Sequence, residues 1–141
     1  MDWTIEFDKA IEQYLPDLEV LQDEPMSRHT TFRIGGPAKR MAFPSSREQL
    51  VLLLSFAKNY GANPLVIGNG SNLLVPDEGL DRLVIDTSAN LNRVERGSGN
   101  TVLADAGATL ARTADLACKS GLTGLEFAHG IPGTVGGGVC M

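Results

Sequence analysis

The sequence predicts an α/β fold, in which strands alternate with helices along the chain. Residues 65–67 are apolar, follow an Asn-Pro breaker and lead into a glycine-rich turn, which is typical of a buried strand. A predicted strand and helix precede this segment, and another strand–helix pair begins near Thr101. The 141 residues, 43% of them hydrophobic, suffice for one domain or two small ones with a real core.

A helix is expected at the N-terminus, where Asp2 can cap it and Pro16 ends it. Its apolar positions recur at helical spacing, at Trp3, Phe7, Ala10, Ile11 and Tyr14. Residues 18–21 alternate with acidic side chains and are expected to form a weak strand or a loop. We assign residues 1–30 to a packing helix and an arm at the edge of the domain.

The centre of the chain predicts a βαβ unit. Residues 39–43 alternate as in a strand, and Ser45 or Ser46 can cap the helix that follows, which Gly61 can end. The apolar face of that helix is expected at Leu50, Leu53, Leu54 and Ala57. Because the second strand is 65–67, the two strands should be parallel and their crossover right-handed.

The remaining expected elements lie after the glycine-rich turn. They are a turn at 77–79, a strand at 83–86, a polar connection at 90–99 with a poorly defined strand at 91–94, and a strand at 101–105. Thr109 can cap a further helix that Gly121 ends. Its apolar face is expected at Leu110, Thr113, Ala114, Leu116 and Ala117.

Composition excludes several classes of protein. A net charge of −5 with scattered Lys and Arg argues against a nucleic-acid-binding protein. No apolar run approaches the length of a membrane span, and Met1-Asp2-Trp3 does not begin a signal peptide. Cys118 and Cys140 lack metal-type spacing, so reduced thiols in a cytosol fit best, with a single disulfide left open. No metal site or catalytic triad is evident around His129.

The turn from Gly68 to Asn72 is the most informative stretch. Two glycines let the backbone approach a ligand, and successive N–H groups in such a turn can hold a diphosphate, with side-chain donors from Ser71 and Asn72. A tight strand-to-strand turn without a ligand is an equal alternative on these residues alone. The turn fits neither the dinucleotide fingerprint nor a Walker loop. Arg33, earlier in the chain, faces a ligand phosphate or is a solvated side chain beside a turn.

A second glycine cluster runs from Gly133 to Gly137. It is expected to open a helix whose amides could face an anion or the edge of a flavin ring. The alternative is close helix packing on small residues.

Three ordered motifs give the chain a family resemblance. They are Thr31-Phe32-Arg33-Ile34-Gly35-Gly36-Pro37-Ala38, Gly68-Asn69-Gly70-Ser71-Asn72-Leu73-Leu74-Val75, and Gly121-Leu122-Thr123-Gly124-Leu125-Glu126-Phe127 leading into Gly130-Ile131-Pro132-Gly133-Thr134-Val135-Gly136-Gly137. Together they resemble the UDP-N-acetylenolpyruvoylglucosamine reductases, and the resemblance extends from about Ser27 onward. The order of the three motifs is far more specific than any one of them.

The resemblance implies an FAD-binding fold of the vanillyl-alcohol-oxidase/PCMH type, with a first lobe at 31–95 and the truncated beginning of a second at 96–141. It implies non-covalent FAD, NADPH as reductant, and reduction of UDP-N-acetylglucosamine enolpyruvate to UDP-N-acetylmuramate in the bacterial cytoplasm. The substrate-binding domain of the family would lie beyond Met141, and so would the serine, glutamate and arginine that carry out its chemistry. Glu126 and Ser120 do not match those positions, so no catalytic residue is assigned.

The resemblance also assigns the cofactor-binding residues. These are Gly68, Asn69, Gly70, Ser71, Asn72, Ile131, Pro132, Gly133, Thr134 and Gly137. Gly138 stands where the family often has alanine. Two alternatives remain open. One is an FAD-linked oxidase of the same superfamily, whose members often attach the flavin through a histidine, although His129 is a poor candidate because the run from Gly130 to Gly137 suits the reductase better. The other is a non-catalytic FAD-binding remnant.

Overall fold

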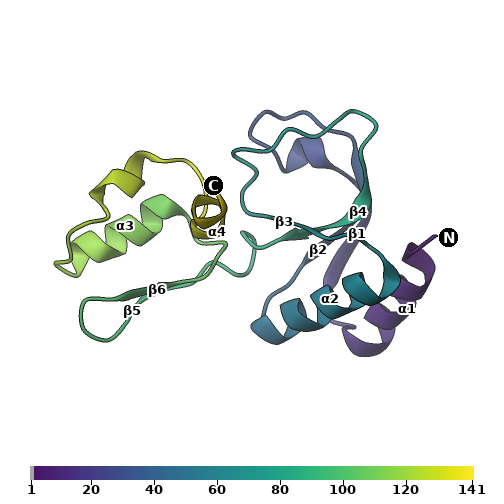
Figure 1. Ribbon diagram of the computed structural model, residues 1–141, viewed down its shortest axis with the longest axis horizontal. Helices are drawn as coiled ribbons and strands as arrows, with labels where there is room; N and C mark the ends of the chain where they lie inside the picture. Colours follow the sequence, from purple (N-terminus) through teal and green to yellow (C-terminus); the bar gives the residue numbers. More distant parts are fainter. Residues whose placement is uncertain (1) are drawn as a thin grey trace.

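Two β-sheets of different size organise the chain, in the computed structural model that describes residues 2–141 (Figure 1). The elements, in order, are α1 (Thr4–Tyr14), β1 (Glu19–Pro25), η1 (Met26–Arg28), β2 (Pro37–Phe43), α2 (Arg47–Tyr60), β3 (Leu65–Ile67), β4 (Leu80–Asp86), β5 (Val94–Arg96), β6 (Val102–Ala104), α3 (Leu110–Lys119), η2 (Glu126–Gly130) and α4 (Val135–Cys140). The α/β class predicted from the sequence is confirmed.

The larger sheet has four strands in the order β1-β2-β4-β3. Both β2 and β3 pair with β4 in parallel, so the predicted parallel direction of the two strands is confirmed. They are not neighbours, however, because β4 lies between them. The three parallel strands therefore end at one edge of the sheet, where ligands of open α/β folds gather.

The N-terminal segment contributes more than the expected helix and arm. Instead of a weak strand or loop, β1 is a seven-residue strand paired antiparallel with β2 along the edge of the sheet. The helix begins at Thr4, one position later than a cap at Asp2 requires, and Trp3 is its N-cap residue. Asp2 still accepts hydrogen bonds from the Thr4 N–H at 3.1 Å and the Thr4 hydroxyl at 2.7 Å.

Local signals fix both ends of α2. Ser46 is the N-cap and accepts a bond from Gln49 N at 3.1 Å, while Gln49 Oε1 accepts one from Ser45 N at 2.8 Å. Gly61 ends the helix in the left-handed region with φ 73°. On the predicted apolar face, Leu53 and Ala57 are fully buried, but Leu54 is exposed, so its assignment to that face is wrong.

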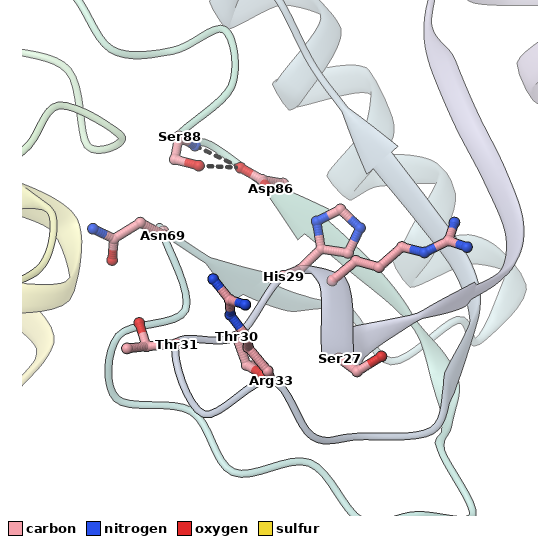
Figure 2. A pocket seen from close by; sticks show the side chains of 10 residues that line it. Ser27, His29, Thr30, Thr31, Arg33, Asn69, Asp86 and Ser88 are labelled. Carbon is pink, nitrogen blue, oxygen red and sulfur yellow. Dashed lines mark hydrogen bonds between the residues drawn. The ribbon is translucent and has the colours of Figure 1, made fainter.

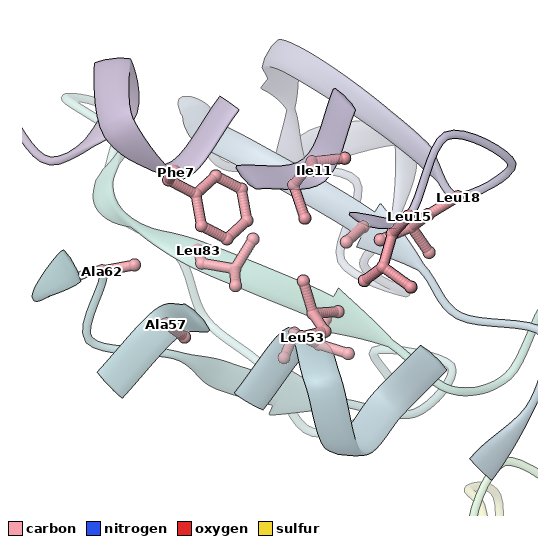
Figure 3. Packing of buried hydrophobic residues seen from close by; sticks show 10 residues of the cluster. Phe7, Ile11, Leu15, Leu18, Leu53, Ala57, Ala62 and Leu83 are labelled. Atoms are coloured by element: carbon pink, nitrogen blue, oxygen red, sulfur yellow. The ribbon is translucent and has the colours of Figure 1, made fainter. Parts of the chain in front are cut away.

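Hydrophobic side chains cover both faces of the larger sheet. Between the sheet and the helices α1 and α2 lies one cluster: Phe7, Ile11, Leu15, Leu18, Ala42, Leu53, Ala57, Ala62, Leu83 and Ile85 (Figure 3). On the other face, beneath the loops, lies the second: Met26, Ala38, Met41, Phe43, Ile67, Val75 and Val84. Neighbouring residues of β4 alternate between the two clusters, as a strand buried on both faces requires.

The smaller sheet is the antiparallel pair β5–β6, on which α3 packs. Its strands are shorter than predicted and β5 begins at Val94, where the expected strand at 91–94 ends. Thr109 caps α3 as predicted, accepting a bond from Arg112 N at 3.1 Å, and Ala114 and Ala117 of the predicted face are buried. The two sheets and their helices form two bodies joined through residues 87–93 (Figure 1).

Among the described residues, no helix combines the length and the hydropathy needed to cross a membrane.

An ion pair joins the first helix to the larger sheet. Arg40 of β2 is buried and donates through Nε and Nη2 to the two carboxylate oxygens of Asp8, at 2.9 and 2.7 Å. This pairing raises the pKa of Arg40, mainly through the hydrogen bond to Asp8. Breaking such a pair leaves a desolvated charge without a partner, which is the costly case.

We therefore expect Asp8→Asn to lower the free energy of unfolding by about 2 kcal/mol, because it weakens charged hydrogen bonds to a buried guanidinium. Urea denaturation followed by circular dichroism measures the change. Glu12→Gln, an exposed site on the same helix, should stay within about 0.5 kcal/mol of the parent. Equal effects at the two sites would contradict a structural role for the ion pair.

Candidate functional site

The loop from Gly68 to Asn72 leaves the carboxyl end of β3, as predicted. It lies at the edge where the parallel strands β2 and β4 also end. Within residues 2–141, the backbone N–H groups of Gly68, Asn69, Gly70, Ser71 and Asn72 donate no hydrogen bond to another protein group. Five consecutive N–H donors without protein partners are available to bind an anion.

Gly70 has the positive φ that its sequence context predicts, and it also packs closely against another part of the backbone. Its φ is 71°, and a Cβ at this position would clash with the carbonyl oxygen of His29. The carbonyl of Gly70 in turn accepts a bond from Thr31 N at 3.1 Å. Gly70 is therefore required for backbone packing against residues 29–31, and its conformation fixes the loop before any ligand is present.

The second glycine cluster lies directly against the first. A Cβ on Gly68 would clash with the Thr134 hydroxyl, and one on Gly133 would lie 3.2 Å from Ser71 Oγ. The structure thus brings together the two segments that the resemblance assigns to the cofactor. They come from different bodies of the fold, so their contact forms a seam between the larger and the smaller sheet.

The amides of the second glycine cluster are only partly available to a ligand. The first four N–H groups of the helix region all have protein acceptors: Val135 N bonds Ala108 O, Gly136 N bonds Ala106 O, Gly137 N bonds Thr134 Oγ1, and Gly138 N bonds Thr134 O. Close packing on small residues, the alternative, fits better, since a Cβ on Gly136 would lie 3.0 Å from Ala106 Cβ. By contrast, Gly133 N and Thr134 N donate no bond within residues 2–141.

The other predicted cofactor residues are accessible to differing degrees. Asn69, Asn72, Ile131, Pro132 and Gly137 are exposed, Ser71 and Gly133 are partly buried, and Thr134 is buried. Asn72 Nδ2 contacts Met141 Sδ at 3.2 Å. The loop and the segment 131–134 therefore offer both backbone and side-chain groups to a ligand.

An open cleft of about 730 Å³ begins at the glycine loop. Its lining is polar and comprises Ser27, Arg28, His29, Thr30, Thr31, Arg33, Gly68, Asn69, Asp86 and Ser88 (Figure 2). Most of the lining between 27 and 31, and the pair Asp86 and Ser88, had no ligand role in the sequence prediction. The sequence could have indicated Asp86 and Ser88 as lining residues, because they lie at and just after the carboxyl end of a predicted strand, where ligands of open α/β folds bind.

The acidic groups of the cleft are already paired with protein. Asp86 is buried, and its Oδ1 accepts bonds from Ser88 N and Ser88 Oγ, both at 2.7 Å. Glu24, which is not among the cleft-lining residues, contacts His29 Nε2 at 2.9 Å and Arg28 at 3.8 Å. The groups of the cleft left without protein partners are mainly donors, which suits an anionic ligand.

No acid–base set is assembled in the described part of the chain. The Glu126 carboxyl accepts bonds from its own backbone N–H and from that of Gly124, which lower its pKa and make it a poor proton donor. Ser120 lies at the end of α3, and His129 lies in η2, so both lie outside the cleft lining. No group of three or more metal-binding side chains occurs within residues 2–141.

The packing of Gly70 can be measured against Gly61, which has almost the same φ (71° and 73°) but open space within 4 Å of the position that a Cβ would take. We expect Gly61→Ala to cost about 1 kcal/mol of unfolding free energy through the left-handed backbone alone. Gly70→Ala should cost clearly more, because the His29 carbonyl must also move. Denaturant unfolding of the two variants gives the difference, and equal costs would show that the close approach is not important.

Comparisons with known proteins agree with this geometry. A family model described as FAD binding domain matches residues 38–141. The chain is 51% identical over 124 residues to the UDP-N-acetylenolpyruvoylglucosamine reductase of Moorella thermoacetica, covering 88% of this chain and 40% of that one. It is 45% identical over 146 residues to the reductase of Agathobacter rectalis, covering 96% and 46%. The chain thus spans less than half the length of these relatives.

Solved structures give the same picture. The crystal structure of the reductase from Thermus caldophilus matches with a TM-score of 0.60 at 33% identity, covering 86% of this chain and 41% of that one. An alkyldihydroxyacetonephosphate synthase matches with a TM-score of 0.65 at 21% identity, covering 94% and 30%, and shows the fold alone. The predicted vanillyl-alcohol-oxidase/PCMH-type fold is confirmed. The chain belongs to the FAD binding domain family, and along most of its length it is similar to the UDP-N-acetylenolpyruvoylglucosamine reductases.

Proposed function

We propose that this chain is the FAD-binding part of an NADPH-dependent reductase that converts UDP-N-acetylglucosamine enolpyruvate to UDP-N-acetylmuramate. The observation that carries the proposal is the row of five N–H groups from Gly68 to Asn72, which have no protein acceptor in the described part of the chain and begin at the edge of the cleft. The identity to named reductases indicates which anion the row would bind. We further propose that residues 31–95 and 96–141 contribute to two lobes that hold the cofactor between them.

The residues at the seam fit a dinucleotide. A diphosphate carries two negative charges, and the loop offers backbone donors that cost no side-chain ordering to present. Gly133 N, Asn69 and Ser71 border the same seam, so they could hold the diphosphate from its other sides. When bound, FAD supplies the chemistry of accepting and donating a hydride, while the protein binds and orients it.

The role of this chain in that reaction is binding and orientation. The resemblance assigns proton donation and enolate stabilisation to residues that match no position in this sequence, so we propose no catalytic residue within it. NADPH, the enolpyruvyl substrate and a cytoplasmic setting belong to the proposed whole reaction. A covalently flavinylated oxidase receives no support from His129, which lies outside the cleft lining.

We expect the chain to bind FAD reversibly, with flavin bands in the visible spectrum that acid releases. Asn69→Asp should weaken binding at least about tenfold, because it places a negative charge of nearly the same shape in the exposed loop beside the diphosphate. Asn59→Asp makes the same change on the exposed surface of α2 and should leave the affinity unchanged. Titration of flavin fluorescence gives the dissociation constants.

Three outcomes of that experiment contradict the proposal in different ways. Protein without flavin bands that also fails to bind added FAD would indicate a remnant. Bands that survive denaturation would indicate covalent attachment and an oxidase. Equal affinities of the two aspartate variants would show that the diphosphate lies elsewhere.

The proposal also predicts that this chain alone does not oxidise NADPH in the presence of the enolpyruvyl substrate. Loss of a positioned general acid typically costs about 10²–10⁴ in rate, and loss of substrate orientation costs more. Substrate-dependent NADPH oxidation, assayed with added FAD, measures this against a full-length homologue. Turnover near the homologue's rate would show that catalytic residues lie within the sequence.

A further inference from the structure

Arg33 occupies an unusual backbone conformation next to the glycine loop. Its φ is 56°, in the left-handed region, which is unfavourable for a residue with a side chain relative to the right-handed region. Such conformations persist where the surroundings enforce them, and they are concentrated at functional sites. The backbone of Arg33 is therefore expected to be held by specific contacts, and its side chain is a candidate for ligand binding.

Three hydrogen bonds hold the turn that carries Arg33. Arg33 N donates to Thr30 O at 3.1 Å, and the buried Thr30 donates through its hydroxyl to Ile34 O at 3.0 Å. The third runs from Thr31 N to Gly70 O at 3.1 Å. Because the last bond ends on the glycine loop, the position of Arg33 is fixed relative to the free N–H groups of that loop.

The guanidinium extends into the cleft, toward the space between Asn69 and His29 (Figure 2). Within residues 2–141 it makes no ion pair or hydrogen bond, whereas Arg40, Arg82 and Arg96 each donate to protein acceptors. Asp86, the carboxylate that lines the same cleft, accepts hydrogen bonds from Ser88. An unpaired cation in this chain of net charge −5 thus faces the same space as the loop donors.

We propose that Arg33 binds the diphosphate of a bound nucleotide, from the side of the cleft opposite the loop from Gly68 to Asn72. The inference rests on the proposed function and adds a side-chain contact to its backbone site. A planar guanidinium can donate two parallel bonds to phosphate oxygens, which a lysine cannot reproduce. FAD and a UDP-linked substrate carry the same diphosphate group, so the binding experiment includes both.

The test compares Arg33→Met with Lys58→Met, which removes one positive charge from the exposed last turn of α2, outside the cleft lining. Dissociation constants are measured on the 141-residue chain for FAD, ADP, UDP-N-acetylglucosamine and riboflavin, which lacks phosphate. We expect Arg33→Met to weaken FAD and ADP about tenfold and to leave riboflavin unchanged. Lys58→Met should bind all four ligands as the parent does.

Two further variants separate charge from backbone effects. Arg33→Lys should recover part of the lost affinity, and Arg33→Asn, a residue that tolerates positive φ, should lose as much as Arg33→Met. Parental affinity in Arg33→Asn would attribute the loss to the backbone and overturn the inference. Thermal unfolding of each variant confirms that the turn still folds.

The pattern across ligands decides the rest. Weaker FAD and ADP binding supports the cofactor as the source of the diphosphate, and weaker UDP-N-acetylglucosamine binding alone supports the substrate. Unchanged affinity for all three, or an equal loss for riboflavin, overturns the inference. If the parent binds FAD and Arg33→Met binds it equally well, only this inference fails. A parent that binds none of the nucleotides overturns the proposed function as well.

Discussion

The close approach of Gly70 to the carbonyl of His29 is the contact on which the geometry of the site depends. Through this contact the glycine loop packs against the turn at 29–31, and the hydrogen bond from Thr31 N to Gly70 O joins the two segments. Hydrogen bonds therefore connect the glycine loop to the turn that carries Arg33, so the position of the loop donors and that of Arg33 depend on each other. Preorganisation of this kind lowers the entropy lost when a ligand binds.

The two glycine-rich segments serve different purposes although their compositions are similar. The loop after β3 leaves its N–H groups without acceptors, whereas the N–H groups of α4 are consumed by Ala108, Ala106 and Thr134. Glycine in the loop leaves the backbone N–H groups accessible to a ligand. Glycine in α4 lets the helix approach Ala106 closely. Which purpose applies depends on the hydrogen-bond partners and not on glycine content.

What the sequence predicts well is what local chemistry determines. Ser46 and Gly61 bracket α2, and Thr109 begins α3, because capping involves residues three or four apart. The insertion of β4 between β2 and β3 and the full length of β1 depend on pairing with distant strands, which no short window encodes. The positive φ of Gly70 was predicted, but its packing against His29 was not, because His29 is far away in sequence.

An acidic chain that binds a diphosphate must overcome its own net charge of −5. At physiological ionic strength, charges farther away than about 8 Å are largely screened, so the groups within the cleft dominate. There the carboxylate of Asp86 accepts hydrogen bonds from Ser88, and the cleft also holds the N–H donors of the loop and the Arg33 guanidinium. These donors and this cation favour an anion, although Asp86 keeps its negative charge. A site so arranged is suited to binding and orienting an anion, because its free groups donate hydrogen bonds and no set of acid and base side chains is assembled among the described residues that line it.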